Sequence, residues 1–353
     1  MTEALTTIAS ALSQVFEEKM AREWNRLCVG LTLLPVKAGV GKNVAWDVEF
    51  SGATAAAVAE GSDVQDAEYT GDVFVPATLA WGEYRSAFRL TELEINVAAS
   101  SIGTPSAIVD LFGERILGCT TKLASLFNAD LYSGNGANGG GGSVPNIVGL
   151  STAIAATGSY AGIYRTGGTN YTEWMGNVLA NSGTPRALTV DLLETADQNI
   201  YTASGASFDW LLCSPGVYRK YASLFVPATR IVSDGRGVAP HGFGAAEYFF
   251  KGKPVYRDKD CTSGTLIMGN SNPDSIALHY VPVAGAPMDV VSRSAMADGQ
   301  NGPGSAQSPT QIPLRIIPIA KTGTSVKMAV YTQLQLAVKH PNQFAIISDI
   351  SES

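Results

Sequence analysis

Basic residues are missing from one long stretch of this chain. No Lys or Arg occurs in the 42 residues between Lys42 and Arg85. The stretch contains eight carboxylates: Asp47, Glu49, Glu60, Asp63, Asp66, Glu68, Asp72 and Glu83. Because the formal net charge of the whole chain is only −7, the remaining residues together carry +1. One segment therefore carries the net charge, and we expect it to lie against another surface of complementary charge.

Charged residues are scarce as well, at 16% of the chain, whereas glycine is frequent, with 37 residues. This composition is typical of a protein that buries much of its surface against partners. The net acidity argues against sequence-specific binding of nucleic acid, which normally needs a basic face. A chain of 353 residues can bury a large core and form two or three domains.

Cysteine is rare, and its four residues (Cys28, Cys119, Cys213, Cys261) include no CxxC pair. We expect isolated buried thiols and a reducing compartment. Long apolar runs are also missing, so no segment is expected to span a membrane. The first 30 residues contain four glutamates and no apolar run, so a signal peptide is not expected.

Recognisable catalytic motifs are absent too. Residues 134–139 match GxGxxG, but they follow a predicted helix and precede coil, so we interpret them as a linker and expect no nucleotide cofactor. The three histidines are far apart, and the acids of residues 60–72 lack the order of an EF-hand loop. Without a nucleophile–base motif or a phosphate loop, we expect neither an enzyme nor a metal or cofactor site.

The N-terminal half predicts four elements in order. Apolar residues recur at helical spacing over residues 4–27, and strand alternation marks 43–53 and 73–97 as two arms of a hairpin. Arms of roughly 18 residues at about 3.3 Å each would reach about 60 Å, beyond the body of the protein. A long helix then begins after Thr104 as its N-cap and ends at Gly134.

The C-terminal half predicts a mixed α/β region. Helices are expected at 189–203 and 214–225, the second capped by Ser214. Strands are expected at 208–213, 246–257, 265–269, 276–281, 314–320, 326–337 and 344–350. Residues 284–312 are rich in Gly, Pro and Ser and predict a long loop.

Two runs are basic. Residues 299–348 contain Arg315, Lys321, Lys327 and Lys339 and no acid, and residues 214–257 contain seven bases against two acids. Either run can be a solvated face, or one of them receives the acidic hairpin of a neighbouring copy.

This order of segments resembles the tailed-phage major capsid proteins of the Hong Kong 97-type fold, an α+β fold. Three local stretches look familiar as well: LLCSPGVY at 211–218, FKGKPV at 250–255 and YTQLQL at 331–336. The resemblance implies an N-terminal arm at 1–35 and an extended loop at 36–100 that lies over an adjacent subunit. It also implies a peripheral domain with the spine helix at 101–143 and 325–353, and a mainly axial domain at 144–324. Some members cross-link through a Lys of the extended loop, which this loop lacks between residues 43 and 84.

The expected function is a coat protein that assembles into pentamers and hexamers of an icosahedral shell around double-stranded DNA. The expected partners are other copies, packaged DNA bound without sequence specificity, and separate scaffold, portal and decoration proteins. The expected location is the virion capsid, after assembly in the host cytoplasm. The alternatives are an encapsulin-like compartment and a soluble binding module. We expect Glu60, Asp63, Asp66 and Glu68 to face Arg315, Lys321 or Lys327 of another subunit.

Overall fold

The structure is a computed structural model. It describes residues 28–51, 57, 60, 73–96, 106–136, 146–166, 171–225, 248–281, 315–322 and 325–353. The predicted helix at 4–27, the cap at Thr104 and the loop at 284–312 lie outside these ranges. No helix in the described part of the chain is long and apolar enough to cross a membrane.

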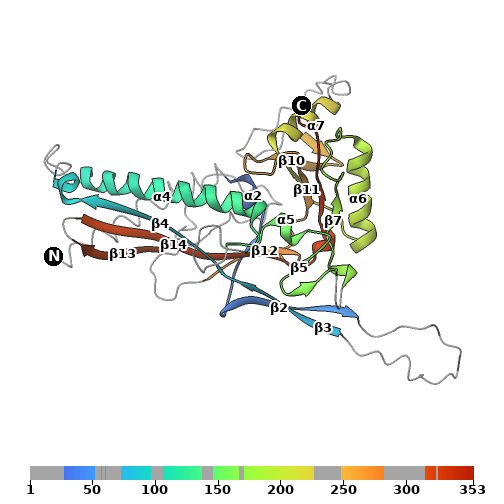
Figure 1. Cartoon of the computed structure of the whole chain (residues 1–353), viewed down its shortest axis with the longest axis horizontal. Helices are drawn as coiled ribbons and strands as arrows, with labels where there is room; N and C mark the ends of the chain where they lie inside the picture. The colour runs from blue at the N-terminus through green and yellow to red at the C-terminus, as the bar shows by residue number, and fades with distance from the viewer. Residues whose placement is uncertain are drawn as a thin grey trace.

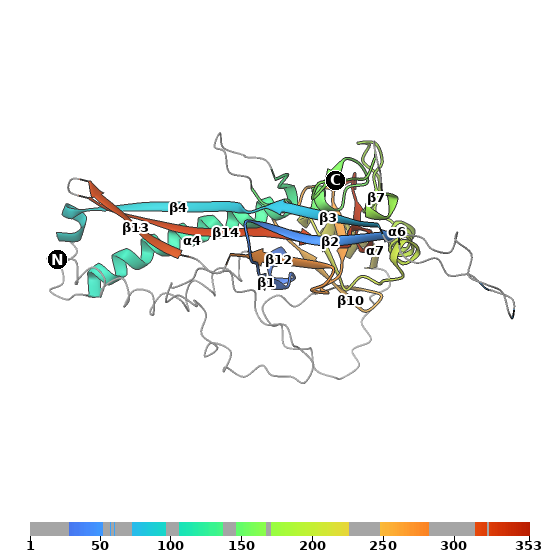
Figure 2. The same cartoon turned by 90° about the horizontal axis from the view of Figure 1, so that it is seen from below.

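A long helix packed on a five-stranded sheet forms one part of the molecule, which we call the helix–sheet lobe (Figure 1). The helix is α4 (Ser106–Ser133), and its 28 residues match the predicted spine helix. The strands are β1 (Val36–Ala38), β4 (Gly82–Thr91), β12 (Ile276–Tyr280), β13 (Arg315–Thr322) and β14 (Ser325–Val338). Strand β4 pairs along one edge of β14, and β13 and β12 follow one another along the other, all antiparallel to it (Figure 2).

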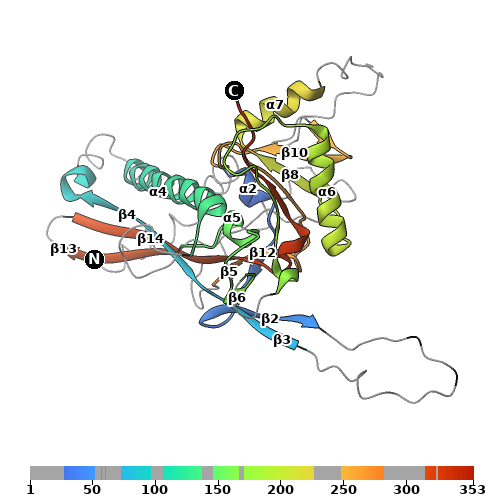
Figure 3. The same cartoon turned by 45° about the vertical axis from the view of Figure 1, so that its right-hand side comes forward.

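The second part, the six-stranded lobe, is a mixed sheet in the order β7-β15-β11-β8-β10-β9 (Figure 3). Its strands are β7 (Asn177–Leu179), β8 (Trp210–Cys213), β9 (Tyr248–Phe250), β10 (Lys253–Arg257), β11 (Leu266–Gly269) and β15 (Ala345–Ile347). Its helices are α6 (Val190–Ser204) and α7 (Pro215–Phe225). The Thr189 hydroxyl accepts from the backbone N–H of Leu192, and Gly205 ends α6 at a φ of 68°.

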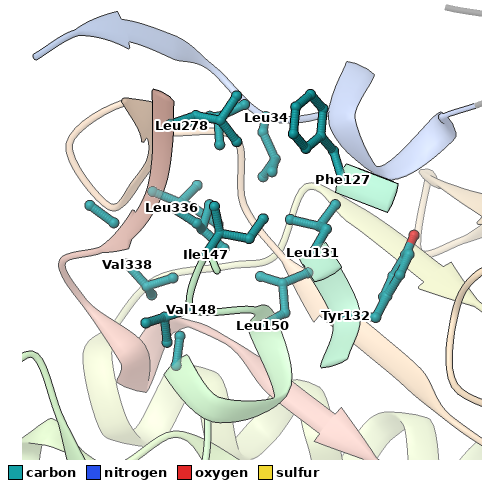
Figure 4. Close-up of a cluster of buried hydrophobic side chains, with 14 of the residues drawn as sticks. Leu34, Phe127, Leu131, Tyr132, Ile147, Val148, Leu150, Leu278, Leu336 and Val338 are labelled. Carbon is teal, nitrogen blue, oxygen red and sulfur yellow. The ribbon is translucent and has the colours of Figure 1, made fainter. Parts of the chain in front are cut away.

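Short elements connect the lobes. They are α2 (Val29–Thr32), α5 (Leu150–Ala153), β5 (Ser159–Tyr160), β6 (Ile163–Tyr164) and two 3₁₀ turns, η2 (Thr172–Trp174) and η4 (Pro341–Gln343). Around them lies a buried apolar cluster to which α4, α5, β12 and β14 contribute (Figure 4). Leu131, Leu150 and Leu336 are at most 1% exposed there. A second cluster lies between the six-stranded sheet and α6 and α7.

The predicted hairpin is half right. Strands β2 (Asn43–Ser51) and β3 (Val73–Ala80) pair as expected. The second arm, predicted to run to residue 97, leaves the hairpin at Trp81 and continues as β4 in the helix–sheet lobe. The paired part is about 30 Å long and does not have the predicted 60 Å reach. Alternation predicts a strand but does not identify its partner, so one run of residues supplied two sheets.

One further strand prediction needs correction. The single strand predicted at 246–257 is, in its described residues 248–257, two antiparallel strands, because Lys251 and Gly252 adopt φ values of 49° and 78° and reverse the chain. The strands predicted at 276–281 and 314–320 pair with β14, whereas β15 lies in the six-stranded sheet. Strands from both sides of residue 325 therefore share the five-stranded sheet. The prediction of buried free thiols is confirmed for all four cysteines.

The histidine of β12 predicts a pH effect on stability. His279 pairs in register with Lys37 of β1, and its Nε2 is buried without a hydrogen-bond partner. Burial, together with the nearby charges of Lys339 and Lys37, lowers the pKa of His279 to about 4, from an ordinary value of 6.5. Between these two values the unfolded chain binds more protons than the folded one, so stability falls as pH decreases through this window.

For this partly exposed side chain we expect a loss of roughly 1–2 kcal/mol between pH 7 and pH 4. Denaturant unfolding of the wild type and of His279→Gln at both pH values measures it. The variant should lose less stability than the wild type over this range. Equal losses in the two proteins would contradict this role of His279.

Candidate subunit interfaces

The outer face of the β2–β3 hairpin is acidic. Asp47 and Glu49 are exposed on β2, opposite Pro76 and Phe74 of β3. Phe74 is itself 57% exposed. No Lys or Arg occurs in either strand. The described part of the hairpin therefore presents two carboxylates and an apolar ring on one face.

The inner face of the same hairpin is aromatic and packs on its own subunit. Phe50 stacks on Tyr171 with ring centroids 3.9 Å apart, and its edge meets Trp174 at 5.9 Å. Trp46 lies 6.5 Å from Tyr160, which in turn stacks on Trp174 at 5.8 Å. The paired strands are therefore held on Tyr160, Tyr171 and Trp174 along their described length, so they do not project freely from the body.

A buried arginine supports this aromatic platform. Arg165 is 0% exposed, and its guanidinium lies 5.4 Å from the centre of the Tyr160 ring. It donates to the backbone oxygens of Trp174 (2.9 Å) and Thr152 (3.0 Å), and also to that of Ala153. Burial lowers the pKa of Arg165 to about 10. The cation thus joins the end of α5, the strand β6 and the turn η2.

Of the four predicted contact acids, only Glu60 is described, at an exposed turn position. Asp63, Asp66 and Glu68 lie outside the described residues. Their contact with another subunit stays a prediction.

The predicted basic partners lie on two neighbouring strands. Lys327 of β14 is directly opposite Ile319 of β13, and the register places Arg315 opposite Tyr331. Lys321 lies near the irregular end of β13. The three predicted positions are therefore in one sheet.

The same sheet contains two cations that we did not predict. Arg85 and Arg89 are exposed on β4, opposite Tyr331 and Lys327 respectively. Because side chains of directly paired residues point to the same face, this face carries Arg85, Arg89 and Lys327 together. We call it the basic sheet face. The other face of β4 packs on α4, where Tyr84 donates to Asp130 at 2.6 Å. In the sequence, Arg85 and Arg89 fall within the predicted second arm of the hairpin, and only the pairing of β4 with β14 places them in this sheet.

The other basic run, residues 214–257, is largely engaged within the six-stranded lobe. Lys251 contacts Glu194 at 2.5 Å and Asp197 at 2.7 Å, and Lys253 contacts Asp209 at 3.2 Å. Two more of the described bases also have partners, since Arg257 lies over the ring of Tyr218 and Arg219 donates to the backbone oxygen of Glu352. These intramolecular partners favour a solvated face for this run.

Comparison with solved structures defines the class of fold. The chain is similar to the capsid protein of cyanophage A-1(L), with a TM-score of 0.65, 20% identity, and coverage of 91% of this chain and 92% of that one. It is similar to the SrpI encapsulin of Synechococcus elongatus PCC 7942, with a TM-score of 0.53, 12% identity, and coverage of 91% and 86%. A protein of Gordonia phage Cozz gives a TM-score of 0.52, 16% identity, and coverage of 91% and 86%. The chain therefore has the Hong Kong 97-type fold of shell-forming capsid proteins.

A family model points more narrowly within this class. Residues 98–246, which include α4, α6 and α7, match the model described as SU10 major capsid protein. No curated protein sequence matches the chain significantly. Fold and family match together support a coat protein of an icosahedral shell.

Proposed function

We propose that this chain is the major capsid protein of a tailed bacteriophage and assembles into the pentamers and hexamers of an icosahedral shell around double-stranded DNA. The observation that carries the proposal is the match of residues 98–246 to a phage major capsid family, within a fold shared by phage capsid proteins along nine-tenths of the chain. The role is structural. DNA would be held by phosphate contacts without base readout.

The second candidate is an encapsulin-like compartment that encloses protein. The similarity to an encapsulin over 91% of the chain favours keeping it, because the fold alone does not separate the two kinds of shell. The family match favours the phage shell. The contents of purified particles decide between them, since nuclease-protected DNA supports a virion and protein cargo supports a compartment.

Particle formation itself tests both candidates against a soluble binding module. Purified protein is examined by size exclusion over a concentration series and by electron microscopy. Closed particles are expected. A monomer that remains unassembled across the series would contradict both shell functions.

The remaining parts of the assembly belong to the same proposal. The chain would divide into an arm (1–35), an extended loop (36–100), a peripheral domain (101–143 and 325–353) and a mainly axial domain (144–324). Strands β12 and β13 would act with the peripheral domain, and β15 with the axial domain, because of the sheets in which they pair. Scaffold, portal and decoration proteins would be separate chains, and assembly would take place in the host cytoplasm.

Within the shell, the acidic hairpin of one subunit would lie on the basic sheet face of the next. Asp47 and Glu49 would be joined by the acids of the tip, and Arg85 and Arg89 by the three basic positions of β13 and β14. The absence of Lys from the hairpin means that strand packing and charge would hold it, without a covalent link.

Charge reversal tests this contact. Changing Glu60, Asp63, Asp66 and Glu68 to Lys should raise the protein concentration needed for assembly about thirtyfold. Four partly exposed charge contacts are together worth about 2 kcal/mol, and each 1.4 kcal/mol is tenfold. Light scattering at several protein concentrations measures the threshold. Changing Arg315, Lys321 and Lys327 to Glu in the same chain should return the assembly threshold most of the way to the wild-type concentration.

The matched control is Asp191→Lys, which reverses an exposed acid on α6. It should assemble at the wild-type threshold. If the fourfold variant also assembles at that threshold, the hairpin does not hold its neighbour by charge.

A further inference from the structure

Apolar packing alone does not fix the angle between the helix–sheet lobe and the six-stranded lobe. One buried cluster contains Leu123 and Phe127 of α4 together with Leu212 and Ile267 of the six-stranded sheet. Such packing is favourable but has no preferred direction. A group with directional bonds to both lobes would be needed to define one angle.

Asp258 is such a group. It follows β10 directly, and its backbone N–H donates to the Cys213 oxygen of β8 at 3.0 Å, so it is anchored to the six-stranded sheet. Its side chain is only 2% exposed. The carboxylate oxygen Oδ2 accepts from the backbone N–H of Gly30 in α2 at 2.9 Å, and Oδ1 accepts from the side-chain amide of Asn128 in α4 at 2.8 Å.

The side-chain amide of Asn128 also bonds a second carboxylate, that of Asp260. Asn128 is 0% exposed, and its Nδ2 also donates to Asp260 Oδ2 at 2.8 Å. The backbone N–H of Asp260 in turn donates to Asp258 Oδ1 at 3.0 Å. One amide on the spine helix is therefore held between two carboxylates of the β10–β11 connection.

Separating the Asp258 carboxylate from its N–H donors would cost free energy, because the group is buried. Among the described residues, no Lys or Arg forms a salt bridge with Asp258; Lys259 contacts Asp260 instead, at 3.6 Å. The buried charge depends on its N–H donors. Any movement that separates α4 from the β10–β11 connection removes the Asn128 donor from a buried carboxylate and leaves it with two of its three N–H donors, which is unfavourable.

The spine helix converts a small rotation at this point into a large displacement. Asn128 lies about 33 Å from the start of α4 at Ser106, so a rotation of about 10° moves that end by about 6 Å. A hydrogen bond is lost when its heavy atoms separate beyond about 3.5 Å. Because Oδ1 of Asp258 bonds Asn128 of α4 and Oδ2 bonds Gly30 of α2, a change in the angle between the lobes must stretch at least one of these two bonds, and the contacts of Asp258 therefore oppose it.

We propose that Asp258 and Asn128 are positioning residues that fix the angle between the two lobes, and thereby the curvature and diameter of the shell. The proposal rests on the shell function above. If both lobes of a subunit contact its neighbours in the shell, a changed angle within each subunit changes the angle between subunits.

The test uses full-length Asp258→Asn and Asn128→Leu, two substitutions of similar size to the original side chains. Both proteins are assembled under wild-type conditions and their particles are sized by electron microscopy. We expect closed or open shells whose diameters are shifted or spread beyond the wild-type range. Asn128→Ser, a smaller change that leaves two donors to Asp258, is measured alongside in case either of the first two fails to fold.

The control is Asn270→Leu. Asn270 is also buried, at 5% exposure, but its amide donates to Gln343 at 2.7 Å, and in the described part of the chain it has no hydrogen bond to α4. This variant should lose thermal stability and still form shells of wild-type diameter. Wild-type diameters from every Asp258 and Asn128 variant that folds would overturn the proposal, as would failure of all three to fold while Asn270→Leu folds and assembles. Absence of particles from the wild type would instead overturn the proposed function.

Discussion

Replacing Arg165 with methionine is expected to lower the free energy of unfolding by about 3 kcal/mol, because two buried carbonyl oxygens and one partly buried one lose this donor. Each unsatisfied buried acceptor costs roughly 1–3 kcal/mol, and the relief of no longer burying a charge offsets part of the sum. Methionine keeps the unbranched apolar stem, so the loss reports the guanidinium. Denaturant unfolding followed by tryptophan fluorescence measures it.

Arg115→Met is the matched control for this substitution. Arg115 has a half-exposed side chain and a single contact to Glu94 at 3.4 Å, so its loss should cost less than about 0.5 kcal/mol. Similar stability in the Arg165 and Arg115 variants would show that the buried guanidinium is not a support of the hairpin platform.

Replacing Trp174 with alanine should have a still larger effect, about 3–5 kcal/mol, since the ring is 2% exposed and lies between Tyr160 and Phe50. Its indole N–H also donates to the backbone oxygen of Tyr160 at 3.3 Å. The cavity would remove the surface on which the β2–β3 hairpin rests. We therefore expect faster proteolytic cleavage within residues 43–51 as well as a lower unfolding temperature.

Phe249→Ala is the comparison for this change, because Phe249 is 61% exposed on β9. Its stability should change by less than about 1 kcal/mol, and cleavage of the hairpin should stay at the wild-type rate. If Trp174→Ala destabilises the protein and leaves hairpin cleavage unchanged, the hairpin is held by contacts other than the aromatic platform.

These two substitutions bear on the proposed shell because they separate two roles of one segment. The inner face of the hairpin is fixed to its own subunit by aromatic rings, and the outer face is left acidic. A hairpin that links subunits needs a fixed inner face as well as a charged outer face. A mobile hairpin would lose much of its binding free energy in becoming ordered.

Helices were the most predictable part of this fold. The spine helix, α6 and α7 were expected within a residue or two of their observed bounds, because apolar spacing and Gly134 or Thr189 mark them locally. Most strands were predicted as well. The strands with which they pair were not predicted, and residues 82–91 were therefore assigned to the hairpin. Strand alternation is the same whether the neighbouring strand is the first arm of the hairpin or β14.

The candidate contact residues divide in the same way. Lys327 and Arg315 were recognised from an acid-free run, whereas Arg85 and Arg89 were missed although they are next to Lys327 in space. Asp258 and Asn128 could not be found from sequence at all, since 130 residues separate them. A lone Asp after a strand and a lone Asn in a helix carry no local pattern that predicts a mutual bond.

The sequence by itself determined the segregation of charge, the long helix and the order of segments, because each depends on composition or on spacing along one stretch of chain. Only the tertiary structure decided that half of the second arm belongs to the five-stranded sheet, that the hairpin rests on Trp174 and Tyr171, and that a buried carboxylate joins the lobes. These features depend on which distant segments come together, and that choice is made by the packing of the whole core.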